Sequence, residues 1–185
     1  MNKQAASQKY QQIRDQALQV TLAEFRDILP NLADGIRLTD LTEEALQAQE
    51  QIPQPVVPGR QIGWNWREVR DNYRRNHLAR IELAIWFNDE LCGLMAGKAS
   101  EGRLVFKLNY MQGGRPQHPL KGQIVPIASR CAELFAIAIA ADWIAIQDPM
   151  DNDELLEYYR DLGFNKRDPF DPRNNALFKP VEYEG

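Results

Sequence analysis

Residues 104–164 read LVFKLNYMQGGRPQHPLKGQIVPIASRCAELFAIAIAADWIAIQDPMDNDELLEYYRDLGF, and this stretch decides the fold. Apolar residues recur at helical spacing after the first loop, at positions 124, 127, 128, 131, 134, 135 and 138. The segments 104–111 and 143–146, which flank this helix, read as strands. A strand, a helix and a strand joined in this way form a crossover whose two strands lie parallel in one sheet. The stretch therefore predicts an α/β unit with one parallel strand pair.

The loop before the crossover helix is the expected ligand site. Ligands of open α/β units bind where helix N-termini meet the carboxyl ends of strands. In this chain that place is the loop QHPLKG at 117–122, directly before Ile124. Pro126 suits the first turn of the helix, where its missing N–H costs little.

The rest of the sheet is predicted to be antiparallel. The compact polar turns Asn88-Asp-Glu90 and Glu101-Gly102 favour consecutive hairpins. A last strand over 176–181 is predicted to close the sheet beside 143–146. We therefore expect a mixed α/β (α+β) fold with a mostly antiparallel sheet. The strand-like segments outside the crossover span residues 36–41, 81–88, 91–99 and 176–181.

The N-terminal 32 residues predict a long amphipathic helix that ends near Pro30. Such a helix needs an apolar partner, either on its own domain, or in a dimer interface or another protein. The apolar stripe consists of Leu18, Leu22, Phe25, Leu29 and Leu32.

Two shorter helices are predicted over 42–50 and 64–80, separated by a loop over 52–63 that is rich in proline and glycine. The second helix has a strongly basic face. Three readings are open: a solvated surface, a site for an acidic or phosphorylated acceptor, or an RNA surface. The arginines of this segment are Arg67, Arg70, Arg74, Arg75 and Arg80.

Composition limits the function classes. A chain of 185 residues with 44% apolar content supports one core and one domain. The formal charge of −4 argues against a dedicated nucleic-acid binder. No apolar run approaches the length of a membrane span, and the polar start MNKQ does not resemble a signal peptide, so a cytoplasmic protein without a membrane partner is expected. Cys92 and Cys131 are predicted to be small buried hydrophobic residues, and a disulfide or metal pair is the alternative. No other metal-ligand spacing is visible in the sequence.

The order of strand meander, crossover helix, strand and final helix resembles the GNAT superfamily of acyl-CoA-dependent N-acyltransferases. The similarity is best at Asn152-x-x-Leu155-x-x-Tyr158-Tyr159-x-x-x-Gly163-Phe164, which is similar to the ending of that family's last conserved helix. The resemblance covers about residues 36–181 and leaves the first helix outside. It implies a GNAT-like domain over 34–185, with helices on both sheet faces and an N-terminal helix extension over 1–33. Acetyl-CoA is the co-substrate that it implies.

Tyr159 occupies the position of the family's tyrosine, which commonly acts as general acid toward the departing thiolate. A phenol with an ordinary pKa of about 10 is protonated at neutral pH and is able to donate to such a group. The other reading is that the ring packs on the sheet, four residues after Leu155 and three before Leu162. The two readings are compatible for an amphipathic ring.

The pyrophosphate loop departs from the family pattern, in which a Gln/Arg-x-x-Gly-x-Gly/Ala segment opens the crossover helix. Only Gly122 is kept, and Ile124 stands where the second small residue is expected and crowds the approach of a diphosphate. Lys121 adds a positive charge. Either the loop binds the pyrophosphate through Lys121, Gly122 and the amides of Gln123 to Val125, or the fold persists without the site.

The resemblance assigns two further contacts to the coenzyme. In the family the strand before the loop diverges from its neighbour, and its backbone pairs with the pantetheine arm. The matching residues here are Asn109, Tyr110 and Met111. Asn152 matches the family's asparagine and is assigned to the same binding set.

A general base is harder to identify, because the strand over 104–111 holds no carboxylate. Glu82 on an earlier strand and His118 in the loop are the candidates. The sequence thus predicts an acetyl-CoA-dependent N-acyltransferase that acts on an amine acceptor. A catalytically degenerate binding module of the same fold is the alternative, and an acyltransferase acting on charged tRNA is a third reading that the acidic charge disfavours. GNAT relatives are often dimers, so a homodimer belongs to the implied properties.

Overall fold

The computed structural model describes residues 2–53 and 63–183. Its strands form one six-stranded sheet in the order β1-β2-β3-β4-β5-β6. All neighbouring strands are antiparallel except β4 and β5, which are parallel. The mixed sheet with one parallel crossover is therefore confirmed. The strands span Ile36–Thr39 (β1), Arg80–Phe87 (β2), Glu90–Ala99 (β3), Val105–Gly113 (β4), Trp143–Gln147 (β5) and Ala176–Pro180 (β6).

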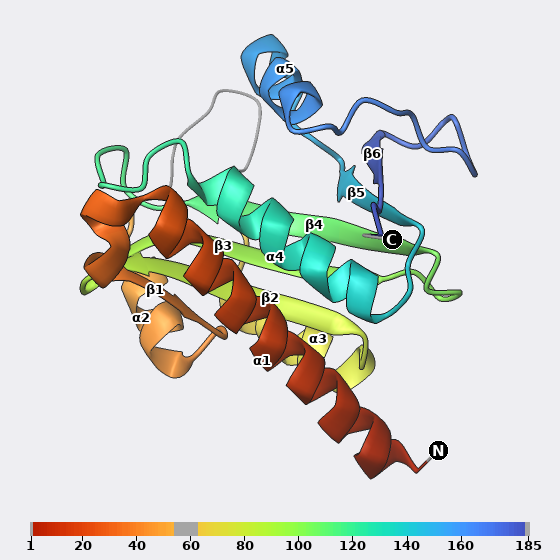
Figure 1. Ribbon diagram of the computed structural model, residues 1–185, viewed down its shortest axis with the longest axis horizontal. Helices are drawn as coiled ribbons and strands as arrows, with labels where there is room; N and C mark the ends of the chain where they lie inside the picture. The colour runs from red at the N-terminus through yellow and green to blue at the C-terminus, as the bar shows by residue number, and fades with distance from the viewer. Residues whose placement is uncertain (1, 54–62, 184–185) are drawn as a thin grey trace.

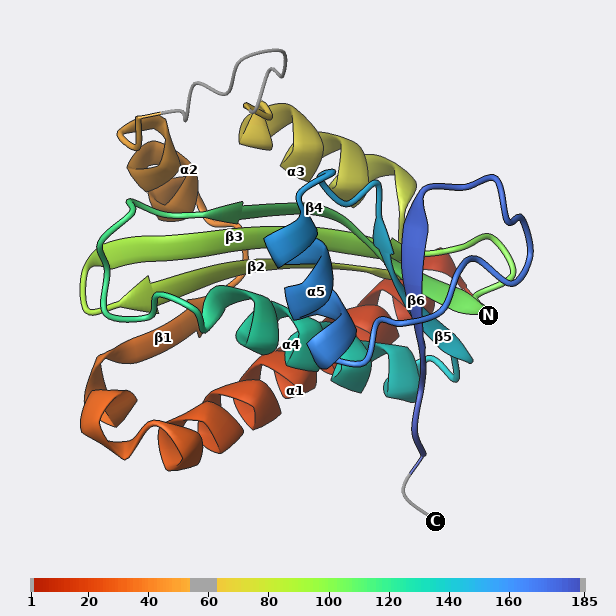
Figure 2. The same cartoon turned by 90° about the horizontal axis from the view of Figure 1, so that it is seen from above.

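Helices cover both faces of the sheet, as Figures 1 and 2 show. Helices α1 and α4 lie side by side on one face, and α2 and α3 lie on the other. Each α-helix was expected from the sequence, whereas the short 3-10 helix η1 (Pro30–Gly35) was not. Residues 54–62 of the predicted loop over 52–63 lie outside the described residues. The helices span Lys3–Ile28 (α1), Glu43–Glu50 (α2), Trp66–Asn76 (α3), Ile124–Ala138 (α4) and Asp153–Asp161 (α5).

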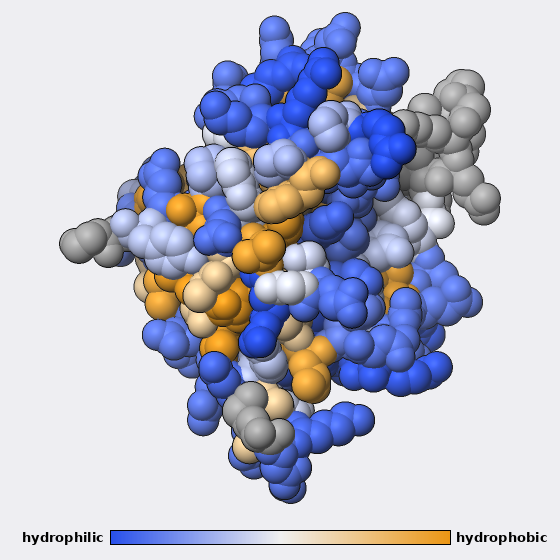
Figure 3. Space-filling model, turned by 90° about the vertical axis from the view of Figure 1, so that its right-hand side faces the viewer, coloured by the Kyte–Doolittle hydropathy of each residue, from blue (hydrophilic) through white to orange (hydrophobic). Residues whose placement is uncertain are grey.

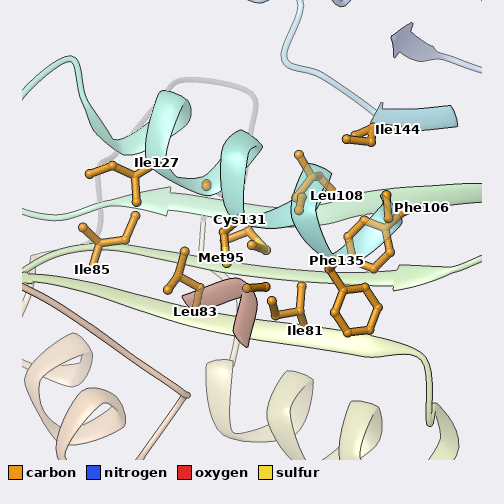
Figure 4. Close-up of a cluster of buried hydrophobic side chains, with 14 of the residues drawn as sticks. Ile81, Leu83, Ile85, Met95, Phe106, Leu108, Ile127, Cys131, Phe135 and Ile144 are labelled. Carbon is orange, nitrogen blue, oxygen red and sulfur yellow. The ribbon is translucent and has the colours of Figure 1, made fainter. Parts of the chain in front are cut away.

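The larger core lies between the sheet and helices α1 and α4. Strand β2 sends alternate side chains to this face, whereas β3 contributes Cys92, which lies at a register shift, and Met95, and the apolar side of α4 packs onto both strands. Cys92 and Cys131 are free thiols with no exposed surface, as the sequence predicts. Figure 4 shows the centre of this core, which includes Ile81, Leu83, Ile85, Met95, Phe106, Leu108, Ile127 and Phe135.

A second core lies between the opposite face of the sheet and helices α2 and α3. The Thr42 side chain caps α2 by accepting from the Ala45 amide, and Asn65 caps α3 through the Glu68 amide. Both helices therefore begin where the sequence places a capping residue. The core itself contains Leu41, Ala45, Leu46, Trp66, Val69, Tyr73, Ala84, Trp86, Leu91, Leu94 and Ala96.

Helix α1 packs on its own domain, against α4 and β1. The buried line of α1 runs through Ala17, Thr21 and Phe25, so only Phe25 of the predicted stripe is fully buried. The four predicted leucines are partly buried at the border of this line. The small Ala17 and Thr21 side chains allow α1 and α4 to approach closely. Both carboxylate oxygens of Glu24 accept from Arg130 on α4, at 2.7 and 2.8 Å, and this pair joins the two helices.

The end of the molecule near β6 is drawn in Figure 3, where apolar side chains form a central band below the polar surface of α5. Leu104 and Phe170 are exposed at this end and border a small groove. In the described parts of the chain, we find no helix that has both the length and the apolar character to span a membrane.

Candidate active site

The parallel strands β4 and β5 diverge at their carboxyl ends. They pair from Val105 and Trp143 only as far as Leu108 and Ile146, whereas β4 continues beside β3 to Gly113. A bulge at the Ala96/Gly97 step of β3 leaves Asn109 as the extra residue of β4. The backbone of β4 beyond Leu108 therefore has no strand partner on the β5 side. The divergence that the resemblance implies is present in the structure.

A cleft of about 460 Å³ occupies this divergence, with an apolar lining. Its walls come from the end of β4, the first turn of α4, the residues after β5, and α5. Five residues that the sequence assigns to the site line the cleft, namely Asn109, Met111, Ile124, Val125 and Tyr159. Other lining residues include Trp64, Leu108, Gly113, Ile146, Gln147, Asp148, Pro149, Met150 and Leu155.

Tyr159 projects from α5 and belongs both to the core and to the wall of the cleft. Only 7% of the residue is exposed, and burial together with the neighbouring Tyr158 raises the pKa of the Tyr159 phenol to about 12. No described residue forms a hydrogen bond with its hydroxyl. The phenol thus keeps its proton at neutral pH, and its donor remains unpaired within the described part of the chain.

The loop before α4 is held by the residue next to Tyr159. Gly122 has a φ of 80°, a left-handed conformation in which a glycine avoids steric strain. The Tyr158 hydroxyl donates a hydrogen bond of 2.8 Å to the Gly122 carbonyl oxygen. This bond connects α5, which carries Tyr159, to the turn at which α4 begins.

Ile124 is accommodated by a glycine in the sheet. A side chain at Gly93 on β3 would place its Cβ only 2.5 Å from the Ile124 Cγ2 atom. The Ile124 side chain, which is 8% exposed, therefore fills the space that Gly93 leaves empty. Its bulk points toward the sheet. The same residue also borders the cleft, so the crowding of a diphosphate that the sequence predicts stays a prediction.

The N-terminus of α4 retains unpaired donors. Its N-cap residue, Gln123, forms no side-chain capping bond, and no acceptor among residues 2–53 and 63–183 pairs with the backbone N–H groups of Ile124 and Val125. Two amides and the positive end of the helix dipole favour an anion at this position. The side chain of Lys121 is exposed beside the same turn.

Five of the predicted coenzyme contacts are not part of the cleft lining, namely Tyr110, Lys121, Gly122, Gln123 and Asn152. Asn152 caps α5, because its Oδ1 atom accepts from the Leu155 amide at 3.0 Å, and it is not part of the cleft lining. Tyr110 faces the α3 side of the sheet, where its ring packs edge to face with Trp64 and Tyr73. The backbone of Tyr110 still belongs to the diverging part of β4.

Neither candidate base lines the cleft. Glu82 is buried under α3, where its Oε1 atom lies 3.4 Å from the Arg74 Nε atom and 3.3 Å from the Arg80 Nε atom. Burial raises the pKa of the Glu82 carboxyl, and its Oε2 atom lacks a hydrogen bond among the described residues. His118 lies in the loop, and burial lowers its pKa. The carboxylate that lines the cleft is Asp148.

The residues after β5 were missed by the sequence reasoning. Gln147 ends β5 and Asp148 follows it, so both lie at the carboxyl end of a parallel strand, which is the same positional signal that identified the loop before α4. The Gln147 amide nitrogen donates to the Asp148 carboxylate at 3.2 Å, while its Oε1 atom is buried and has no partner in the described chain. Applied to both strands of the parallel pair, the rule would have found them.

The basic face of α3 is paired with carboxylates of this chain. Arg67 contacts Glu43 at 2.6 Å and Glu50 at 3.0 Å, both on α2. Arg70 contacts the second oxygen of Glu43 at 3.3 Å. Arg74 reaches Asp40 at 2.9 Å as well as Glu82. Most of the basic face therefore serves to join α3 to α2 and β2.

The comparison with solved structures identifies the fold. No protein family model and no curated protein sequence matches the chain. Among solved structures, an acetyltransferase of the GNAT family from Staphylococcus aureus Mu50 aligns with a TM-score of 0.60 at 12% identity, covering 80% of this chain and 99% of that one. The PaiA N-acetyltransferase from Thermoplasma acidophilum, solved with coenzyme A, aligns with a TM-score of 0.57 at 15% identity, covering 78% and 98%.

A third structure, the ribosomal-protein-S18-alanine N-acetyltransferase from Escherichia coli, aligns with a TM-score of 0.55 at 12% identity and covers 81% of this chain and 96% of that one. The chain therefore has the GNAT fold. All three neighbours are described as acetyltransferases, two of them as N-acetyltransferases. At such low identity, the similarity shows the fold alone.

Proposed function

We propose that this chain, which has the GNAT fold, is an acyl-CoA-dependent N-acyltransferase. The observation that carries the proposal is the cleft between β4 and β5. There an unpaired strand edge, an uncapped helix N-terminus and the Tyr159 phenol border one space of about 460 Å³. These groups suit, in the same order, three parts of an acyl-CoA: its amide-containing arm, its diphosphate and its thioester.

The backbone of the cleft supplies the binding contacts in this proposal. Residues Asn109 to Met111 of β4 present their main-chain groups to the pantetheine arm on the side that β5 leaves open. The amides of Ile124 and Val125, with the Lys121 ammonium, bind the diphosphate. None of these contacts needs a particular side chain except that of Lys121.

Tyr159 acts on the leaving group. The acceptor amine attacks the thioester carbonyl carbon, the C–S bond breaks with its electron pair on sulfur, and the thiolate is stabilised by the Tyr159 hydroxyl. Because the pKa of about 12 lies well above that of a thiol, about 8.5, transfer of the proton to sulfur is uphill. Tyr159 therefore acts chiefly as a hydrogen-bond donor to the developing charge, and the proton that finally neutralises the thiolate comes from solvent.

The amine must lose a proton as the amide forms. Asp148 is the carboxylate in the described lining of the cleft, and we assign it as the acceptor of this proton, directly or through a water molecule. Glu82 and His118 lie outside the lining, so we give them no direct role.

Calorimetric titration with acetyl-CoA and with free coenzyme A tests the proposal. We expect both to bind with micromolar Kd, because the strand edge and the helix N-terminus contact parts that the two molecules share. A matched titration with adenosine separates binding through the diphosphate from binding of the nucleoside alone. If neither acetyl-CoA nor free coenzyme A binds, the proposal is contradicted and the degenerate binding module is favoured.

A further inference from the structure

A second hollow of about 560 Å³ lies on the α3 side of the sheet and shares the side chain of Trp64 with the cleft. Consecutive residues of β4 line the two spaces, since Asn109 borders the cleft and Tyr110 borders the hollow. An acceptor held here would lie directly beside the cleft. The lining consists of Gly63, Trp64, Asn65, Glu68, Val69, Asn72 and Tyr110.

The hollow combines aromatic rings with a carboxylate. The rings of Trp64 and Tyr110 meet edge to face, with centroids 5.4 Å apart and an interplanar angle of 82°. Trp64 is 36% exposed, the largest exposure of a tryptophan in the described chain, so part of its ring is open to a ligand. Glu68 is exposed on the same wall. Ring faces and a carboxylate both attract ammonium groups.

Among the described residues, the lining contains no lysine, arginine or histidine. The arginines that suggested an acidic acceptor point toward α2 and β2, where Glu43, Glu50, Asp40 and Glu82 pair with them. Arg75 lies one helical turn beyond Asn72 and does not border the hollow. The one charged side chain of the described lining is the carboxylate of Glu68, which disfavours an acidic or phosphorylated amine there.

We propose that this hollow is the acceptor site and that it selects organic amines carrying at least one additional ammonium group. The inference rests on the proposed function. The attacking nitrogen must be neutral to act as a nucleophile, so the charge that Trp64, Tyr110 and Glu68 recognise belongs to a second nitrogen. Linear diamines and polyamines meet this requirement.

Binding of spermidine to the protein, followed by calorimetry and by tryptophan fluorescence, tests the site without any catalytic step. Compared with the unchanged protein, Glu68→Gln is expected to weaken binding about threefold, the size of an exposed ion pair, and Trp64→Leu to weaken it by a similar factor of about three. Glu101→Gln, which removes a carboxylate from the β3–β4 turn, is the matched control and leaves the affinity unchanged.

The selectivity follows from a comparison of three amines. O-phosphoethanolamine and n-butylamine are expected to bind at least about tenfold more weakly than spermidine, because one carries negative charge and the other has no second ammonium group. Equal affinity of Glu68→Gln and the unchanged protein for spermidine would overturn the inference, and so would tighter binding of O-phosphoethanolamine.

Coenzyme titration separates this inference from the proposed function. Micromolar coenzyme binding without any preference for spermidine would refute only the acceptor assignment. Spermidine binding that depends on Glu68, in a protein that does not bind coenzyme A, would support the cation site and refute acyl transfer. If the protein binds neither coenzyme A nor spermidine, both proposals are refuted.

Discussion

The cleft at the end of β4 and the interface between α2 and α3 both carry sequence patterns typical of function. They differ in whether their polar groups already have partners within the chain. In the cleft, the amides of Ile124 and Val125 and the Tyr159 hydroxyl have no partners among the described residues. Between the helices, Arg67 and Arg70 are paired with Glu43. A ligand binds through groups that have no partner within the protein. The backbone amides of the cleft are therefore better candidates for ligand binding than the α3 arginines, which join α3 to α2.

Substitutions test this difference between the cleft and the α2–α3 interface, and the largest effect, on turnover, is expected at Tyr159. The Tyr159→Phe variant keeps the buried ring and removes the donor, so kcat should fall about a hundredfold while the Kd for coenzyme A stays within about a factor of two. Turnover is measured by release of the coenzyme thiol, and Kd by calorimetry.

An equal loss of turnover and of coenzyme affinity at this position would indicate a packing role instead. The pH dependence adds a second check. Since the pKa of Tyr159 is raised to about 12, the phenol stays protonated up to pH 10, and the unchanged enzyme should show no falling limb of activity between pH 7 and about pH 10.

The next largest effect is expected at Gly122. A valine there must adopt a left-handed conformation or move the turn away from α4, and affinity for coenzyme A should fall at least about tenfold. Gly102→Val is the matched control, because Gly102 lies in an exposed turn, has no positive φ and meets nothing closer than a Leu104 side-chain atom at 3.8 Å. Calorimetry measures both variants. Equal affinity of the two would remove this loop from the site.

A smaller effect is expected at Tyr158. Tyr158→Phe removes the hydrogen bond to the Gly122 carbonyl oxygen. Loss of this single bond should weaken coenzyme binding about threefold to tenfold, and the fold-change in kcat should be smaller than the fold-change in Kd. Tyr183→Phe provides the control, because the Tyr183 hydroxyl also donates to a backbone carbonyl, that of Ala141, away from the cleft. If both variants bind coenzyme A as the unchanged protein does, Tyr158 does not position the loop.

The smallest effect is expected on the α3 arginines. Arg67→Gln breaks two exposed ion pairs, so the midpoint of thermal unfolding should fall by less than about 4 °C. Its kcat/KM for O-phosphoethanolamine should stay within about a factor of two, because the charge it loses was already paired within the chain. A selective loss of activity toward that amine, measured by thiol release, would restore the basic face as an acceptor site.

The sequence located part of the candidate site through local signals. The position of Tyr159 followed from its spacing to Gly163 and Phe164, and the loop before α4 followed from the strand–helix order. The contact between the Ile124 side chain and Gly93 on β3 was not predicted, and the effect of Ile124 on a bound diphosphate stays a prediction. Gly93 lies 31 positions away in the chain, and no periodicity in the sequence indicates the contact.

The sequence by itself determined the order and type of the strands and α-helices, the parallel pair β4 and β5, and the apolar faces of the core except that of α1. These properties follow from spacing and capping within a few consecutive residues. Only the tertiary structure decided which polar groups are already paired. The Arg67 pairs and the bond from Tyr158 to Gly122 each join residues 17 to 36 positions apart, so whether a charge or a donor remains for a ligand depends on packing that local patterns do not encode.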